Sequence, residues 1–125
     1  MSQELPDLDD PALDKVIERQ SLICGALSNP TRLRIIYLLK DGPMAQSNLG
    51  ERLGISRPLL SQHLKQMRSV GVVESRREGN SVTVSLAAAE VGRACDFMRG
   101  FLVKRMQEQG ELARRVAEAE VEVER

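Results

Sequence analysis

The chain has 125 residues, a formal net charge of zero and a hydrophobic content of 42%, which fit one globular domain with a single core. Two Phe, one Tyr and no Trp leave that core aliphatic, and the lack of a long apolar run excludes a membrane span. The acidic N-terminus lacks the basic-then-apolar order of a signal peptide, so we expect a cytoplasmic protein.

Charge is distributed unevenly along the chain. Residues 1–30 hold 2 basic and 6 acidic side chains, residues 31–80 hold 9 and 4, and residues 81–125 hold 7 and 8. The middle of the chain is therefore basic, although the whole is neutral. A basic middle between acidic flanks can attract a polyanion to one face.

Two helices are predicted in the first third of the chain, after a flexible tail over residues 1–9. Asp10-Pro11 and Asn29-Pro30 each combine an N-cap residue with proline at the first helical position, so a helix begins at each. The first helix ends near Gly25 to Leu27. The second, TRLRIIYLLK, stops at the breaker Asp41-Gly42-Pro43.

Two shorter helices follow and are separated by a tight turn. The first runs from about Gln46 to Leu53 and ends at Gly54, and Ser56 then caps a helix that continues to about Val70. Two short helices joined by a turn that contains glycine form the layout of a helix-turn-helix.

A β-hairpin is predicted after these helices. Val72-Val73 and residues 81–86 (SVTVSL) have the composition of two strands. The polar segment SRREGN, residues 75–80, contains glycine and suits the turn between them.

The remainder is predicted as one long helix over residues 87–121, with residues 122–125 frayed. Gly100 and Gly110 weaken its apolar stripe, so a break is possible there. The order of elements predicts a mainly α fold, a winged helix-turn-helix of about five helices plus a two-stranded β-hairpin wing. We expect it to form a single domain over residues 10–121.

The polar face of the helix after Ser56 carries no acidic residue. With the helical repeat, seven side chains fall within an arc of about 140°: Arg57, Pro58, Ser61, Gln62, Lys65, Arg68 and Ser69. An ordinary solvated face mixes charges of both signs, and this helix of a helix-turn-helix enters the major groove. Arg and Gln suit base edges, whereas Lys and Ser suit phosphates. The face is therefore predicted to contact DNA.

The one histidine and the paired arginines are interpreted differently. His63 falls in the middle of the apolar arc of the same helix, so we expect a packed, hydrogen-bonded residue rather than a ligand or a base. Arg76 and Arg77 are expected at the hairpin tip. Exposed turns are commonly charged, but the tip of a wing can also reach the minor groove or its phosphates, where arginine is favoured.

The stretches ALSNPTRLRIIYLL, LGISRPLLSQHLKQMRSVGVVESRREGN and VTVSL together resemble the ArsR/SmtB family of winged-helix bacterial repressors, over roughly residues 20 to 90. The resemblance implies a homodimer formed through the first and last helices. It also implies binding to double-stranded operator DNA of inverted-repeat type and release by a metal, metalloid or sulfur species. By position, it implies DNA contact by Arg57, Ser61, Gln62, Lys65 and Gln46.

The usual sensor sites of that family are missing. Residues 43–48 lack the cysteine pair of arsenic and cadmium sensors, and the last helix offers Asp96 and glutamates but no histidine. Tyr37 and Val103 stand where the persulfide-sensing branch has cysteines. We therefore predict no metal site of these kinds and no cofactor.

Two cysteines remain as candidate sensors, Cys24 near the end of the first helix and Cys95 early in the last. They form neither a disulfide framework nor a zinc site by spacing, and each lies on the apolar stripe of its helix. One interpretation is a pair of small core residues. The other is a thiol pair that oxidises, takes up sulfur or binds a soft ion.

The sequence thus predicts a homodimeric, sequence-specific transcriptional regulator, a repressor released by a thiol-reactive, sulfur-species or soft-metal(loid) signal. Two alternatives stay open: a winged-helix regulator without small-molecule input, and a winged helix used for protein contact. An enzyme is not predicted, because the chain has no glycine-rich phosphate loop and no Ser/His/Asp grouping.

Overall fold

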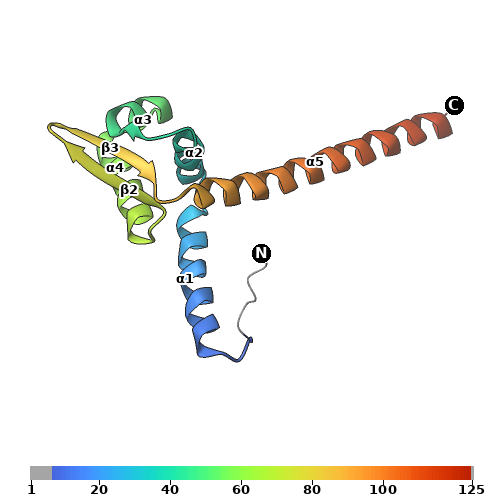
Figure 1. Ribbon diagram of the computed structural model, residues 1–125. Helices are drawn as coiled ribbons and strands as arrows, with labels where there is room; N and C mark the ends of the chain where they lie inside the picture. Colours follow the sequence, from blue (N-terminus) through green and yellow to red (C-terminus); the bar gives the residue numbers. More distant parts are fainter. Residues whose placement is uncertain (1–6, 125) are drawn as a thin grey trace. The chain divides into compact units, whose positions relative to one another are not determined.

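The computed structural model describes residues 7–124 and has the predicted fold class, five helices with a small antiparallel sheet (Figure 1). The elements in chain order are α1 (Pro11–Leu27), α2 (Pro30–Leu39), β1 (Met44–Ala45), α3 (Gln46–Leu53), α4 (Arg57–Ser69), β2 (Val73–Glu78), β3 (Ser81–Leu86) and α5 (Ala89–Glu124).

The chain divides into two compact units. Residues up to Gly92 form the first, which contains every element from α1 to β3 and the start of α5. The second begins at Arg93 and consists of the rest of α5. That helix is continuous, and neither Gly100 nor Gly110 interrupts it. It extends to Glu124, so the predicted end at residue 121 was too early.

Local signals start the first, second and fourth helices as the sequence predicts. The side chain of Asp10 accepts from the amide of Ala12, that of Asn29 accepts from two amides of α2, and that of Ser56 accepts from Leu59. Proline stands in the first turn of each of these helices. It is tolerated there because the first amides of a helix have no intrahelical acceptor.

The core of the first unit is aliphatic, as the composition requires. The residues that are at most 5% exposed come from α1, α2, α3, α4, the sheet and the connection before β2: Leu13, Ile35, Ile36, Leu39, Leu49, Leu60, Leu64, Met67, Val72, Val73 and Val84. One face of α4 supplies three of them. Packing of that face holds the opposite, polar face of α4 toward solvent.

The sheet has three strands in the order β1-β3-β2, so the wing is larger than the predicted two-stranded hairpin. Met44 and Ala45 pair with Val84 and Thr83 along the free edge of β3. The turn is also shorter than predicted. β2 continues to Glu78, because all six of its residues find partners on β3, and Gly79 at φ +61 begins the two-residue connection.

The helix-turn-helix itself is closed by glycine. Gly54 has φ +66 and its amide donates to carbonyls in the last turn of α3, a backbone conformation that glycine adopts without a steric penalty. Gly50, in the middle of α3, lies opposite Leu60 of α4, where a Cβ would already be in contact. Across the described residues, no helix combines the length and the apolar character needed to cross a bilayer.

Candidate nucleic-acid interface

Helix α4 presents a polar face without acidic residues. Arg57, Ser61, Gln62 and Lys65 are exposed, and the 13 residues of the helix include no Asp or Glu. These positions agree with the predicted polar arc. The arrangement offers guanidinium, hydroxyl, amide and ammonium groups along one side of a rigid helix.

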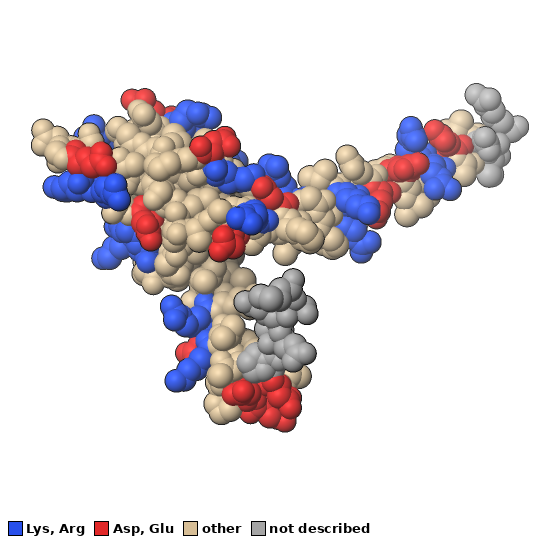
Figure 2. Space-filling model, viewed as in Figure 1, with Lys and Arg blue, Asp and Glu red and all other residues tan. Residues whose placement is uncertain are grey.

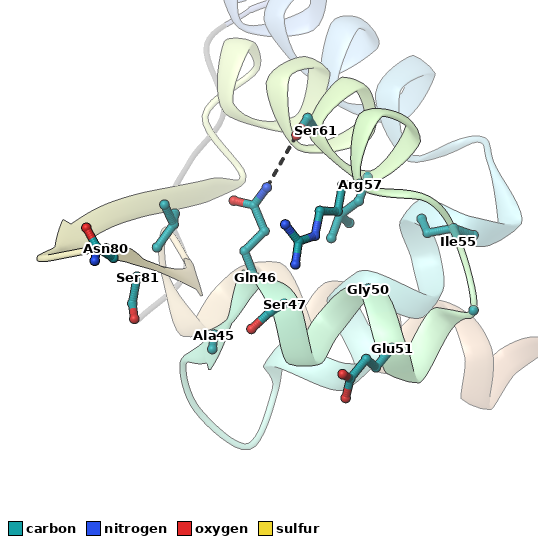
Figure 3. A pocket seen from close by; sticks show the side chains of 13 residues that line it. Ala45, Gln46, Ser47, Gly50, Glu51, Ile55, Arg57, Ser61, Asn80 and Ser81 are labelled. Carbon is teal, nitrogen blue, oxygen red and sulfur yellow. Dashed lines mark hydrogen bonds between the residues drawn. The ribbon is translucent and has the colours of Figure 1, made fainter.

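A hollow of about 590 Å³ lies between α3, α4 and the β2–β3 connection (Figure 3). Gln46, at the start of α3, donates from Nε2 to Oγ of Ser61 at 3.4 Å. Arg57 extends from the first turn of α4 into the space beside α3. The structure therefore brings together three of the predicted contact residues, including Gln46, which comes from another element.

A second hollow, of about 350 Å³, separates α4 from the wing. Gln46, Ser61, Arg68 and Arg77 line it. Arg68 donates from Nη1 to Oγ of Ser75 on β2 at 3.1 Å, which ties the last turn of α4 to the base of the wing. The individual contact residues that the family resemblance implies did not include Arg68. It lies on the predicted polar arc, but its partner on β2 is set by the tertiary fold.

The two wing arginines lie on opposite faces of the sheet. Both are on β2 rather than in the turn, where Arg76 pairs with Thr83 and Arg77 pairs with Val82, and side chains of a strand alternate between faces. Arg77 lines the hollow beside α4. Arg76 lines a different hollow together with Glu74 and Glu78, and its Nη1 is 3.9 Å from a carboxylate oxygen of Glu78. The prediction that both arginines occupy the tip was therefore wrong.

His63 is a packed residue, as predicted. It is 9% exposed among the apolar side chains of α4, and its Nδ1 accepts from Nε of Arg32 at 3.1 Å. Burial and the nearby Arg32 charge lower the pKa of His63. The ring is therefore neutral at pH 7, in agreement with its role as an acceptor.

The cysteines differ in their surroundings. Cys24 on α1 is exposed and Cys95 on α5 is half-buried. Burial, and then the charge of Asp96, raise the pKa of the Cys95 thiol, so it is protonated at neutral pH and weakly nucleophilic. Within residues 7–124, no three His, Cys, Asp or Glu side chains are grouped to hold a metal ion.

Basic side chains gather along the edge of the first unit that carries the wing, with acidic ones interspersed (Figure 2). The start of α1 is acidic, in agreement with the charge of residues 1–30. In this view the basic and acidic side chains near the wing are mixed, and the acidic cluster at the start of α1 lies apart from them.

Comparison with known proteins identifies the family. A model described as "Bacterial regulatory protein, arsR family" matches residues 29–75. The transcriptional repressor SdpR of Bacillus subtilis is 33% identical over 79 residues, which are 63% of this chain and 88% of that protein. The chain belongs to the ArsR family. The transcriptional activator HlyU of Vibrio cholerae is also 33% identical over 79 residues, 63% of this chain and 73% of HlyU.

Solved structures of two bacterial proteins share the fold. HlyU from Vibrio cholerae superposes with a TM-score of 0.65 and 30% identity, over 70% of this chain and 96% of that one. The homodimeric winged helix-turn-helix DNA-binding domain of Mb0332 from Mycobacterium bovis has a TM-score of 0.74 at 23% identity, over 82% and 95%. As an ArsR-family protein, the chain is a transcriptional regulator and not an enzyme, as the sequence predicts.

Proposed function

We propose that this ArsR-family protein is a homodimeric repressor that binds an inverted-repeat operator by inserting α4 into the major groove. The observation that carries the proposal is the acid-free face of α4, where Arg57, Ser61, Gln62 and Lys65 are exposed. Arginine and glutamine match the donor and acceptor patterns of base edges, while lysine and serine suit the phosphate backbone. Gln46 extends this surface onto α3.

The dimer contact is assigned to α1 and α5, because both carry exposed apolar side chains. On α1, Val16, Ile17 and Leu22 are 49–60% exposed. On α5, Phe97 and Phe101 are 85% and 60% exposed. Isolated proteins rarely leave large apolar surfaces in water, so a second copy of the chain is the occupant that we propose for both.

The test of DNA binding uses the region upstream of the protein's own gene. Fluorescence anisotropy at several salt concentrations is expected to give specific binding whose affinity falls steeply with salt, because each neutralised phosphate contributes a slope of about −0.9 in log–log form. Sedimentation of the free protein is expected to give a dimer. A flat salt dependence, or no binding, would favour the alternative in which the winged helix serves protein contact.

The two wing arginines are expected to contribute differently to operator affinity, because they lie on opposite faces of the sheet. Arg77→Ala is expected to weaken operator binding by about threefold to tenfold, because Arg77 is on the face of the sheet that is turned toward α4 and can reach a phosphate. Arg76→Ala is expected to change it by less than about twofold, since Glu78 lies beside it. Anisotropy titration of both variants at one salt concentration measures the difference, and equal losses would contradict the assignment.

Release by a thiol-directed signal is the second part of the proposal, and exposure of Cys24 supports it. Polysulfide treatment is expected to release operator DNA from the wild type but not from Cys24→Ser. Cys95→Ser is expected to retain most of the response, because burial raises the pKa of the Cys95 thiol and leaves it weakly nucleophilic. Gel shift measures release, and reduction by dithiothreitol is the control for reversal. Equal binding by all treated proteins would favour a regulator without this input.

A further inference from the structure

Arg32, in the first turn of α2, connects α1 and α4 through one guanidinium group. Its Nε donates to Nδ1 of His63 at 3.1 Å, and its Nη1 donates to the carbonyl oxygen of Ala26 at 3.1 Å. The side chain is half-buried and the two acceptors lie on different helices. The contact therefore joins three helices of the first unit.

At the α1 end, Arg32 satisfies a carbonyl that the helix itself leaves open. Ala26 is in the last turn of α1, where carbonyl groups have no intrahelical donor. The neighbouring carbonyl of Gly25 is already taken by the amide and the hydroxyl of Ser28. A cation at this end also complements the helix dipole, so the guanidinium is held there by two favourable effects.

At the α4 end, the contact requires an uncharged histidine. A guanidinium group can only donate, so Nδ1 of His63 must be the acceptor and the ring proton must be on Nε2. A protonated imidazole would have no free acceptor and would place a second cation against Arg32. Burial is the larger cause that lowers the pKa of His63. Among the described charged residues on the elements packed around α4, Arg32 is the one whose charge lowers it further.

We propose that Arg32 is a positioning residue for DNA binding, which holds α4 in a fixed place relative to the end of α1 while His63 is uncharged. The inference rests on the proposed function, in which α4 reads the operator and α1 contributes to the dimer contact. In that arrangement, Arg32 helps to set the separation of the two α4 helices, which must match half-sites about 34–36 Å apart.

Two substitutions separate this role from charge and from packing. Arg32→Lys retains the positive charge, but one ammonium nitrogen does not reproduce the planar fork that reaches two helices. His63→Asn places an amide oxygen near the position of Nδ1 and cannot take up a proton. Arg34→Lys is the matched control, because Arg34 is an exposed arginine on the same helix.

Operator binding is measured first at pH 7.5. Arg32→Lys is expected to lose on the order of tenfold in operator affinity, while its affinity for non-operator DNA, which depends on charge, is unchanged. Arg34→Lys is expected to behave as wild type on both DNAs. The ratio of the two affinities is the readout that a general loss of stability does not reproduce.

The pH profile is the second readout. The chain has one histidine, and histidine is the side chain whose ordinary pKa lies between pH 5 and 8. Between pH 7.5 and 5.5 the wild type is expected to lose operator affinity relative to non-operator DNA, by less than about tenfold because the pKa of His63 lies below its ordinary value. His63→Asn is expected to give a flat ratio. Circular dichroism verifies that each protein is folded at each pH.

Stability follows from the same linkage. The pKa of His63 is lower in the folded protein than in the unfolded chain. As the pH falls below the ordinary pKa of histidine, the unfolded chain therefore takes up the proton first. The wild type therefore loses stability from pH 7 to 5.5, and His63→Asn is expected to lose less. Nitrogen-15 NMR of His63 is expected to show an unprotonated Nδ1 at pH 7.

The outcomes distinguish the two proposals. If the wild type does not bind the operator at pH 7.5, the proposed function is overturned and this inference falls with it. If the wild type binds but Arg32→Lys keeps both its affinity ratio and its pH profile, this inference alone is overturned. A pH profile of His63→Asn identical to that of the wild type would also overturn it, because proton uptake would then lie elsewhere.

Discussion

Leu64→Ala is expected to lower the free energy of unfolding by about 2 to 5 kcal/mol. Leu64 is fully buried at the centre of the first unit, with Ile35, Ile36 and Leu49 equally inaccessible. Truncation removes apolar surface from the core and leaves a cavity that close-packed neighbours fill only in part. In a small domain this is a large fraction of the total stability. Urea unfolding followed by circular dichroism at a fixed protein concentration measures the loss.

Leu59→Ala is the matched control for that measurement. It makes the same chemical change on the same helix, but Leu59 is 40% exposed, so the expected loss is about 1 kcal/mol or less. Operator affinity of both variants, measured where they are folded, is expected to stay near the wild-type value. Equal destabilisation by the two substitutions would contradict the assignment of one buried face to α4.

Arg57→Ala is expected to weaken operator binding by about 1 to 3 kcal/mol. Arg57 is the first residue of α4, and the first residues of the recognition helix are those that contact base edges in a helix-turn-helix. Its guanidinium is exposed and extends into the hollow beside Gln46 and Ser61 (Figure 3). Loss of a base contact is expected to reduce discrimination between operator and non-operator DNA, as well as affinity.

Arg34→Ala serves as the control for charge, because Arg34 is exposed on α2 and lines neither of the hollows beside α4. It is expected to leave the ratio of operator to non-operator affinity unchanged. Competition titrations with both DNAs measure that ratio. A loss by Arg57→Ala that is equal on the two DNAs would assign Arg57 to the phosphate backbone instead, and no loss would contradict the proposed orientation of α4.

Most of the fold was predictable, because it is signalled within a few residues along the chain. Asp10, Asn29 and Ser56 each precede a proline or a polar first turn, and each caps a helix in the structure. Gly54 ends α3 as predicted. The strand Met44–Ala45 was not predicted. Two residues show no periodicity, and they form a strand only because the edge of β3 is available to pair with them.

The candidate site was predictable where one helix carries it. The helical repeat separates the exposed residues Arg57, Ser61 and Lys65 from the buried face, and it assigned His63 correctly to the core. The wing was predicted less well. Two adjacent arginines in a polar segment indicated that both side chains lie at the hairpin tip. Pairing with β3 instead extends the strand through Arg76 and Arg77 and directs them to opposite faces of the sheet.

The sequence by itself determined where α1, α2 and α4 begin, the polar face of α4 and the family, since each depends on short-range capping, periodicity or residue identity. Only the tertiary structure decided which distant side chains meet. Arg32 and His63 are 31 residues apart, and Arg68 reaches Ser75 across a turn into the wing. Such pairs have no fixed spacing along the chain, because they form only where packing of the apolar core brings two elements together.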